Sequence, residues 1–508
     1  MKRVFTLHLT IALLVISCFG CFSASAEEGT EPVRLVYYYK AVSDANEQSD
    51  PEIMQMVHDR IMEDTGVDLE IIVGSRNDED YTTKLNLMLS SNQQVDIFTD
   101  SWSPLYVKGF LADLTDYIPN VPEAQQALSM MRQETIDSVT VNGRMMAFPF
   151  NDAGACYPVW LRSDLLEKCG LEKPQTIDEL EHVLRTFKEM DPVGDGNTMG
   201  LVTSAEGLRK SFMGAFTENG DGRFMDDEGN IKPYFLDPGY KDFVQTMHDW
   251  YAEGLIEPET FSYNRNNIIE FIRQGRVASF AEWYSMVTLS YKQFKDVFPD
   301  ADYTWIDGLT GDKGLAESIW PVTKPSVGER SGDAVCINAN CKDIEAALRV
   351  VAWGYLNDGE NFLTAYQGIE GINWQWVDEE TKTYELLDTD QKYMGEYNIY
   401  MSLVNELSVN SLDPERLFHN EWLREGWFRY DNVKWSVDRY VQYDNAALKE
   451  NVPTYVEIME YVEEEFVKFV MGARPMEEWD AYMETVESLG VDDMVAEFTR
   501  QYNEQMNA

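Results

Sequence analysis

The amino-terminal part of the chain alternates short apolar runs with longer amphipathic segments. The apolar runs predict strands, and the segments between them have apolar residues at helical spacing. We expect strands at 33–39, 68–73 and 95–98, and helices at 49–65 and 81–91. Gly66 follows the first of these helices, where a glycine suits a carboxyl-terminal cap. Strands and helices that alternate at this spacing predict parallel βαβ units with right-handed crossovers.

The same pattern continues through the middle of the chain and then gives way to helical periodicity. The stretch from Ala147 to Leu166 carries Pro149 and Gly154 and leads into an apolar run, so we interpret it as a hinge followed by a buried strand. Further on, the pattern predicts helices at 176–190, 237–253 and 343–357, and strands at 157–162, 277–280 and 334–338. The segment 268–274 leads through Gly275 to the strand at 277–280. The last third is mainly helical by its periodicity.

Polar and aromatic residues follow the ends of the first predicted strands. In open α/β sheets, ligands bind beyond the carboxyl ends of the strands. The residues that occupy this position are Tyr39, Lys40, Asp100 and Trp102. We therefore expect them to contribute to a ligand site.

The net charge and the amino-terminal leader limit where this protein can act and what it can bind. A basic Lys2-Arg3 pair precedes an apolar run and small residues, which predicts an export signal over residues 1–26. Two processing routes stay open: lipidation of Cys18 at the Val15–Cys18 box, or cleavage after Ala24–Ala26. The formal net charge of −48 argues against nucleic-acid binding, because phosphates repel it. We expect an exported protein that is lipid-anchored to the outer face of the cytoplasmic membrane, or otherwise secreted.

Cysteine and histidine give no metal pattern. After the leader no C-x-x-C is present, and each histidine is isolated, so no zinc spacing results. Two pairings, Cys156/Cys169 and Cys336/Cys341, are open because export permits disulfides, and buried free thiols are the alternative. No cofactor is expected.

Six segments in order along the chain resemble one known family, the bacterial extracellular solute-binding proteins of ABC importers. The resemblance is to the carbohydrate-type group, related to maltose-binding protein. The segments that carry it are KLNLMLSSNQQVDIFT (84–99), PVWLRSDLLEKCGLEKPQTIDEL (158–180), FLDPGYKDFVQTMHDWYAEGLIEPE (235–259), FIRQGRVASFAEW (271–283), YQGIEGINWQW (366–376) and MGARPMEEWDAYMETVESLGVDDM (471–494).

The resemblance implies an α/β fold of two lobes, a clamshell in which each lobe has a central, mostly parallel sheet flanked by helices. It implies three crossovers, near 155–159, 279–283 and 333–336. The first lobe would then hold 32–155 plus 284–333, and the second lobe 156–283 plus 334–508. Ligand would bind between the lobes and close them by hinge bending.

The function that follows from the resemblance is capture of a sugar or oligosaccharide and its delivery to ABC permease subunits in the membrane, by a monomer. A peptide or another polar solute is an alternative ligand. A cell-surface sensor or adhesion protein with the same fold is an alternative role. No enzyme is expected, because no P-loop, G-x-S-x-G or H-E-x-x-H motif is present.

One loop departs from the family pattern. Relatives often carry a calcium loop of the form Asp-Pro-Asp-Gly-Asn-Gly where this chain has Asp191-Pro-Val193-Gly-Asp195-Gly. An apolar Val193 replaces an oxygen ligand, and calcium needs six to eight oxygens. We therefore expect no metal at this loop.

Aromatic residues are the candidates for sugar contact, because the C–H faces of sugars lie flat on rings while hydroxyl groups bond polar side chains. Packing in the core is the alternative for any one of them. Trp102 and Trp283 are favoured, because each follows a strand end, and Glu282 directly precedes Trp283. Glu370 and Asn373 are polar candidates, with a turn-forming role as the alternative, and Arg162 is expected in a structural ion pair. The tryptophan candidates are Trp102, Trp283, Trp320, Trp374 and Trp427.

Overall fold

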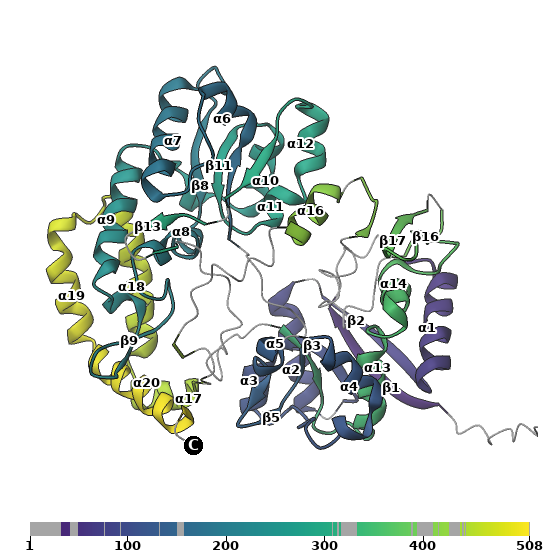
Figure 1. The fold of residues 1–508 in the computed structure, drawn as a ribbon. Coiled ribbons are helices and arrows are strands. Elements are labelled where there is room, and N and C mark those ends of the chain that lie inside the picture. The colour runs from purple at the N-terminus through teal and green to yellow at the C-terminus, as the bar shows by residue number, and fades with distance from the viewer. Residues whose placement is uncertain are drawn as a thin grey trace, which may run out of the picture. The chain divides into compact units, whose positions relative to one another are not determined.

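The fold was analysed in a computed structural model of the 508-residue chain. The structure describes residues 32–506 except 41–48, 76, 92, 132, 150–156, 307, 312–313, 316–332, 388–389, 394–409, 415, 426–436, 439–440 and 442. Its described elements form two α/β lobes, each built on its own central sheet (Figure 1).

The first lobe is built on a sheet of strand order β2-β1-β3-β15-β6. Strands β1 and β2 pair in parallel, as do β1 and β3, while β15 pairs antiparallel with both β3 and β6. The parallel pairings of the first three strands confirm the βαβ prediction. The strands are β1 (Val33–Lys40), β2 (Val67–Gly74), β3 (Ile97–Ser101), β6 (Phe148–Pro149) and β15 (Asp333–Ile337).

Successive residues of β1 are buried on opposite faces of this sheet. Leu35, Tyr37 and Tyr39 belong to a core with α1 (Pro51–Thr65) and α13 (Ile344–Trp353). Tyr38 points to the other face, into a core with α2 (Asp78–Ser90) and α3 (Trp102–Val107). Both faces are therefore covered by helices, which explains why the strand is apolar and buried from Leu35 to Tyr39.

The second lobe has a sheet of strand order β12-β7-β11-β8. Strands β8 and β11 pair in parallel, whereas β7 pairs antiparallel with β11 and with β12. The sheets of both lobes are thus mixed, where a mostly parallel arrangement was predicted. The strands are β7 (Val159–Arg162), β8 (Met199–Thr203), β11 (Val277–Ala281) and β12 (Tyr303–Trp305).

Helices also cover both faces of the second sheet. One core joins β7 and β8 to α7 (Ile177–Met190), α8 (Ala205–Phe212), α9 (Gly239–Ala252) and the carboxyl-terminal helices. The core on the other face joins the sheet to α10 (Arg265–Arg273), α12 (Tyr291–Val297) and α16 (Leu417–Glu425). The carboxyl-terminal helices are α17 (Asn445–Asn451), α18 (Tyr455–Val470), α19 (Trp479–Ser488) and α20 (Val491–Met506). In Figure 1, α18 and α19 are drawn in yellow beside α9.

Smaller elements complete both lobes. Helix α6 (Ser163–Cys169) follows β7, and α11 (Ser285–Thr288) follows β11. Helix α14 (Glu360–Gln367) and the hairpin of β16 (Trp374–Asp378) and β17 (Thr383–Leu386) pack on the core of the first lobe. The remaining described helices and strands are α4 (Pro122–Ser129), α5 (Gln133–Asp137), β4 (Thr140–Val141), β5 (Arg144–Met145), β9 (Phe224–Met225), β10 (Ile231–Lys232), β13 (Thr310–Gly311) and β14 (Gly314–Leu315).

Sheet membership differs from the predicted lobe boundaries in two segments. Residues 284–333 were placed in the first lobe, but α12 and β12 pack in the second. Residues 334–508 were placed in the second lobe, but β15, α13 and the β16–β17 hairpin belong to the first. The chain therefore changes sheet between β12 and β15 and again between β17 and α16, and β11 does not lead out of its lobe. The reason is that strand partners are chosen by tertiary packing, for which the local pattern carries no signal.

Candidate functional site

The candidate site is built at one edge of the sheet in the second lobe. Strands β8 and β11 run in parallel and end there at Thr203 and Ala281, which are register partners. Antiparallel β7 begins at the same edge, because Val159 pairs with Ala281. This edge is the carboxyl end of the parallel strands, the place where open α/β sheets bind ligands.

Two rings meet at this edge. The Tyr157 and Trp283 rings lie 5.6 Å apart between centroids at an interplanar angle of 84°, an edge-to-face pair. The Tyr284 and Trp283 ring centroids lie 5.7 Å apart. Tyr157 and Tyr284 are buried, whereas Trp283 is half-buried and keeps part of its surface in solvent. Trp283 therefore has the environment that a ring needs if it is to contact a ligand.

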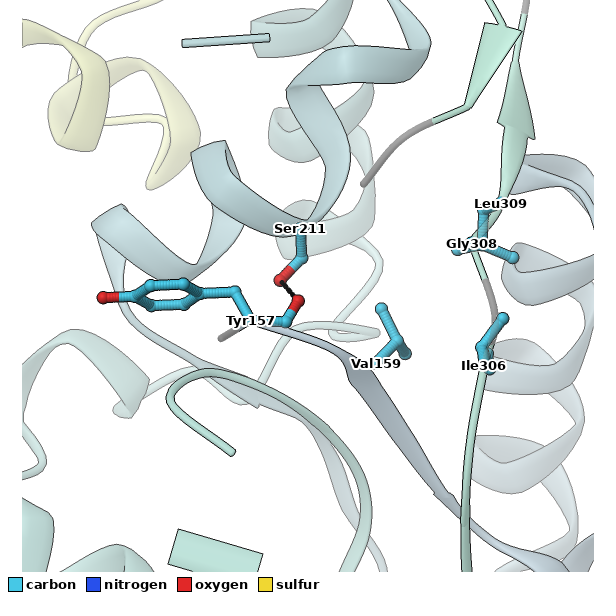
Figure 2. A pocket seen from close by; sticks show the side chains of 6 residues that line it. All are labelled: Tyr157, Val159, Ser211, Ile306, Gly308 and Leu309. Atoms are coloured by element: carbon cyan, nitrogen blue, oxygen red, sulfur yellow. Dashed lines mark hydrogen bonds between the residues drawn. The ribbon is translucent and has the colours of Figure 1, made fainter. Parts of the chain in front are cut away.

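A shallow hollow borders the Tyr157 side of the ring pair. Its lining comes from β7, α8 and the segment after β12, and consists of Tyr157, Val159, Ser211, Ile306, Gly308 and Leu309. Figure 2 shows the Ser211 hydroxyl directed at the Tyr157 carbonyl, to which it donates a hydrogen bond of 2.9 Å, and the Tyr157 ring extending away from Val159 and Ile306. The hollow is mostly apolar, but its volume of about 10 Å³ admits no more than a water molecule, so it does not itself hold a sugar.

A polar network connects the strand ends to the first turn of α8. The Thr203 hydroxyl donates to the Ala281 carbonyl at 2.6 Å. Ser204 caps α8, since its hydroxyl oxygen accepts from the Gly207 amide at 2.9 Å, and that same hydroxyl donates to Glu282. The Glu282 carboxylate also accepts from the Trp283 amide at 3.1 Å. These hydrogen bonds hold the backbone from Ala281 to the amide of Trp283.

Glu282 is a buried carboxylate at this site. Glu282 is 7% exposed, and this burial raises the pKa of its carboxyl group above the usual range. Hydrogen bonds from Ser204 and Trp283 act in the opposite direction, because they favour the charged form. Perturbed groups of this kind are frequent at functional sites, and they also occur in structural networks.

The predicted residues of the first lobe lie at the corresponding edge of its sheet. Lys40 pairs in register with Gly74 at the ends of β1 and β2, and Asp100 lies near the end of β3. Both side chains are partly exposed, and Asp100 accepts a hydrogen bond of 3.2 Å from the Thr82 hydroxyl. Tyr39 is buried in the core. Lys40 and Asp100 thus remain candidates for ligand contact, while the burial of Tyr39 gives it a packing role.

Two predicted tryptophans pack in the core. Trp102 is 1% exposed and lies against Tyr106, with ring centroids 6.1 Å apart. It is the first residue of α3, and the helix turns its ring inward. Trp374 is fully buried, and its indole N–H donates to the Gly368 carbonyl at 2.8 Å. Both rings are therefore buried in the core, which favours the packing alternative.

The polar candidates beside Trp374 form a turn. Asn373 is buried, accepts from the Ile369 amide at 2.9 Å, and donates to the Gln391 carbonyl at 2.8 Å. Glu370 is exposed on the same turn. Asn373 therefore has the turn-forming role that was the alternative. Arg162 has the predicted ion pair, at 2.7 Å from Asp164, and also donates to the Gly275 carbonyl at 2.8 Å.

Trp320, Trp427 and Cys18 lie outside the described residues, as does most of the hinge at 150–156. Tyr157, Ser204 and Ser211 were missed as site residues. Tyr157 was predicted only as the start of a strand, although an aromatic residue directly after a Gly-containing turn was an available signal. No sequence signal connects Ser204 with Glu282, since the two residues are 78 positions apart.

The Asp191 loop does not fit a calcium ion. Both Asp191 carboxylate oxygens accept hydrogen bonds from the loop itself: the Gly196 amide donates at 2.7 Å, and the Thr198 amide and hydroxyl donate at 3.1 and 2.6 Å. Lys168 places its ammonium group 2.5 Å from the Pro192 carbonyl, and Val193 packs against the apolar core. Within the described parts of the chain no group of three or more His, Cys, Asp or Glu side chains is arranged to hold a metal.

Cys169, Cys336 and Cys341 are free thiols in the structure, so the open alternative of a Cys336–Cys341 disulfide is wrong. The proposed pairing of Cys156 with Cys169 involves a residue outside the described ranges, but Cys169 itself is free. Burial raises the pKa of the Cys341 thiol to about 12, which makes it unreactive at neutral pH.

Comparison with known proteins identifies relatives along most of the chain. The family model described as bacterial extracellular solute-binding protein matches residues 44–361. The fructooligosaccharide ABC transporter substrate-binding protein FusA of Streptococcus pneumoniae serotype 4 (strain ATCC BAA-334 / TIGR4) is 21% identical over 505 residues, covering 89% of this chain and 87% of its own.

Solved structures share the fold. A solute-binding protein from Bifidobacterium longum infantis ATCC 15697, described as HMO-binding and associated with an ABC transporter, has a TM-score of 0.67 at 19% identity. It covers 93% of this chain and 98% of its own. The N-glycan transport solute-binding protein NgtS from Streptococcus pneumoniae has a TM-score of 0.64 at 18% identity, with the same coverage of 93% and 98%.

The helices of the described segments include none that combines the length and the apolar character needed to cross a membrane. The family match covers more than half of the chain, and the two mixed α/β sheets agree with the fold of the solved relatives. The chain belongs to the bacterial extracellular solute-binding proteins.

Proposed function

We propose that this protein captures an oligosaccharide outside the cell and delivers it to an ABC permease. The observation that carries the proposal is the half-buried Trp283 ring, paired with Tyr157 beside the buried Glu282 carboxylate. Ring faces suit the C–H faces of sugars, and polar groups at the rim suit their hydroxyl groups. FusA, NgtS and the HMO-binding protein support a sugar ligand for this chain as well.

The proposed site uses the carboxyl edges of both sheets. Trp283 would bind from the second lobe, with its ring packed against the buried Tyr157 ring, and Lys40 and Asp100 would bind from the first. In this proposal a bound sugar draws the two lobes together by hinge bending. Trp320, Trp427 and the exposed Glu370 remain candidate contacts of the same proposal.

The direct test is a thermal-shift screen over oligosaccharides of different classes. The panel should contain fructo-oligosaccharides, human-milk oligosaccharides and N-glycan fragments, with tripeptides and free amino acids as the polar-solute arm. A ligand that binds only the folded state at 100 times its dissociation constant adds about 2.7 kcal/mol of stability, which is a clear rise in Tm. Binding of tripeptides and of no sugar would contradict the proposal.

The protein would act on its ligand by binding and release without chemical change, as a monomer. Chromatography of the bound sugar before and after long incubation tests the first point, because a hydrolase would shorten it. Light scattering with and without sugar tests the second. Capture of the cognate permease subunits by this protein after detergent extraction of the membrane would favour import over a sensor or adhesion role.

Anchoring is a separate proposal. The Val15–Cys18 box supports lipidation of Cys18, which would tether the protein to the outer face of the cytoplasmic membrane. Mass spectrometry of the mature protein should then find a lipid-modified Cys18 at the amino terminus. A free amino terminus at Glu27 would instead show cleavage after Ala26 and a secreted protein.

A further inference from the structure

We propose that Glu282 is a positioning residue that fixes the Trp283 ring through the backbone of Trp283 and the first turn of α8. This inference rests on the proposed function of Trp283 as a sugar platform and adds what holds that platform in place. The residues that carry it are at one end of β8 and β11, and among the described residues of the proposed site Glu282 is the buried acid.

The Glu282 side chain bridges two separate backbone segments. One carboxylate oxygen accepts from the Trp283 amide at 3.1 Å, and the other accepts from the hydroxyl of Ser204. Ser204 in turn is bonded to the Gly207 amide at 2.9 Å as the cap of α8. The backbone that carries Trp283 is thereby connected through one carboxylate to the start of a helix.

One face of α8 supports both rings of the pair. Positions 204, 207 and 211 are three and four residues apart, so they lie on the same side of the helix. Ser204 holds Glu282, and Ser211 donates to the Tyr157 carbonyl at 2.9 Å. The helix therefore sets the backbone of both aromatic residues, whose rings meet 5.6 Å apart.

Close approach of α8 to β11 is built into the sequence through Gly207. A Cβ at this position would lie 2.3 Å from the Ala281 carbonyl oxygen and 2.8 Å from a Glu282 carboxylate oxygen. Glycine is the residue that admits the carboxylate here. The Glu282 carboxylate thus occupies a space that the surrounding chain leaves for it, as a positioning group requires.

A pair of substitutions separates hydrogen bonding from charge. Glu282→Gln keeps one carbonyl oxygen, which can still accept from the Trp283 amide, and offers an amide group to Ser204. Glu282→Ala removes both bonds. If Glu282 acts by holding backbone, the glutamine variant retains the position of Trp283 and the alanine variant loses it.

The experiment uses the full chain labelled with 5-fluorotryptophan and observed by ¹⁹F NMR without any sugar. The Trp283 resonance is assigned as the one missing from Trp283→Phe. We expect it to stay in place in Glu282→Gln and to shift and broaden in Glu282→Ala, with the resonances of the other tryptophans unchanged. The matched control is Glu497→Gln, a buried carboxylate on α20 that bonds Arg500 and Gln501. It should leave the Trp283 resonance unchanged.

An unmoved Trp283 resonance in Glu282→Ala would overturn the proposal, and so would an equal displacement in both Glu282 variants. If Glu282→Ala does not fold, Ser204→Ala provides the test, since it removes the hydroxyl donor to the same carboxylate. An unmoved resonance in Ser204→Ala would then overturn it. Because the measurement needs no sugar, its failure is distinguishable from failure of the oligosaccharide screen.

Discussion

Trp283 and Trp102 both follow the end of a strand, yet their side chains have different environments. Trp102 begins a helix that turns its ring into the core, where it is 1% exposed. Trp283 lies before α11, in a loop fixed by the Glu282 carboxylate, and stays half-buried. A residue's distance from a strand end therefore does not decide its role, because the next turn of backbone decides where the ring points.

At the residue scale, Asp191→Asn should lower the Tm at neutral pH. Three hydrogen bonds from Gly196 and Thr198 lower the pKa of the Asp191 carboxyl below its usual value. A lowered folded-state pKa stabilises the fold above the unfolded value of about 4, and this contribution is lost as pH falls through the folded value. Asparagine tolerates the left-handed backbone at this position, φ 42°, so the change isolates the carboxylate.

The measurement is the Tm of wild type and Asp191→Asn between pH 7 and pH 3. The difference should be largest at pH 7 and should shrink below about pH 4, where the wild-type carboxyl takes up its proton. A difference that grows towards acid would show that the Asp191 hydrogen bonds are not those of a carboxylate.

At the scale of elements, the Asp191 loop is held together by its own hydrogen bonds. Its carboxylate is already bonded by the loop, and the Lys168 ammonium lies at the Pro192 carbonyl. We therefore expect removal of calcium by a chelator to leave the Tm unchanged, and added calcium to have no effect. A rise of several degrees on adding calcium to a chelated sample would contradict this interpretation of the loop.

Helix α8 is the element that connects the candidate site to its sheet, and Gly207 controls its approach. In Gly207→Ala the new methyl group would have to displace the Ala281 carbonyl from a distance of 2.3 Å. We expect a loss of about 1–3 kcal/mol in the free energy of unfolding, the usual cost of overpacking. Urea denaturation measures this loss. If the Ala281 carbonyl can move away without cost, the higher helix propensity of alanine would instead stabilise the variant, which would contradict the prediction.

Much of the secondary structure was predictable, whereas its assembly was not. The runs at 33–39 and 277–280 fall within β1 and β11, because residues buried on both faces of a sheet leave a largely continuous apolar pattern. The run at 68–73 falls within β2, which is only partly buried. Strands β12 and β15 themselves were assigned to the wrong lobes, since pairing between distant strands leaves no local pattern. The contact of Ser204 with Glu282 was unpredictable for the same reason.

At the scale of the whole molecule, we expect the large excess of acidic residues to affect the stability of the fold and not the affinity for the proposed neutral ligand. A formal charge of −48 opposes the compact state by self-repulsion, which salt screens. We expect the Tm to rise between about 10 mM and about 150 mM NaCl, where the Debye length falls from about 30 Å to about 8 Å. A Tm that falls over this range would show that favourable ion pairs outweigh the repulsion.

The same salt series examines the ligand class. The affinity for a neutral oligosaccharide should change little with salt, because no charge is neutralised when it binds. An affinity that depends steeply on salt would indicate a charged ligand, such as an acidic polysaccharide fragment, and would narrow the proposed function to that class.

The measurement that tests the central claim most directly is calorimetric titration of Trp283→Ala with the best oligosaccharide of the screen, beside Trp374→Ala as a core control. Loss of a stacking platform costs about 1–3 kcal/mol by analogy with base–aromatic stacking, a tenfold to hundredfold loss of affinity, with little change in a urea melt. Trp374→Ala should instead lose about 3–5 kcal/mol of stability, because that ring is fully buried. Near-normal affinity in Trp283→Ala together with a large drop in its melt midpoint would contradict the account.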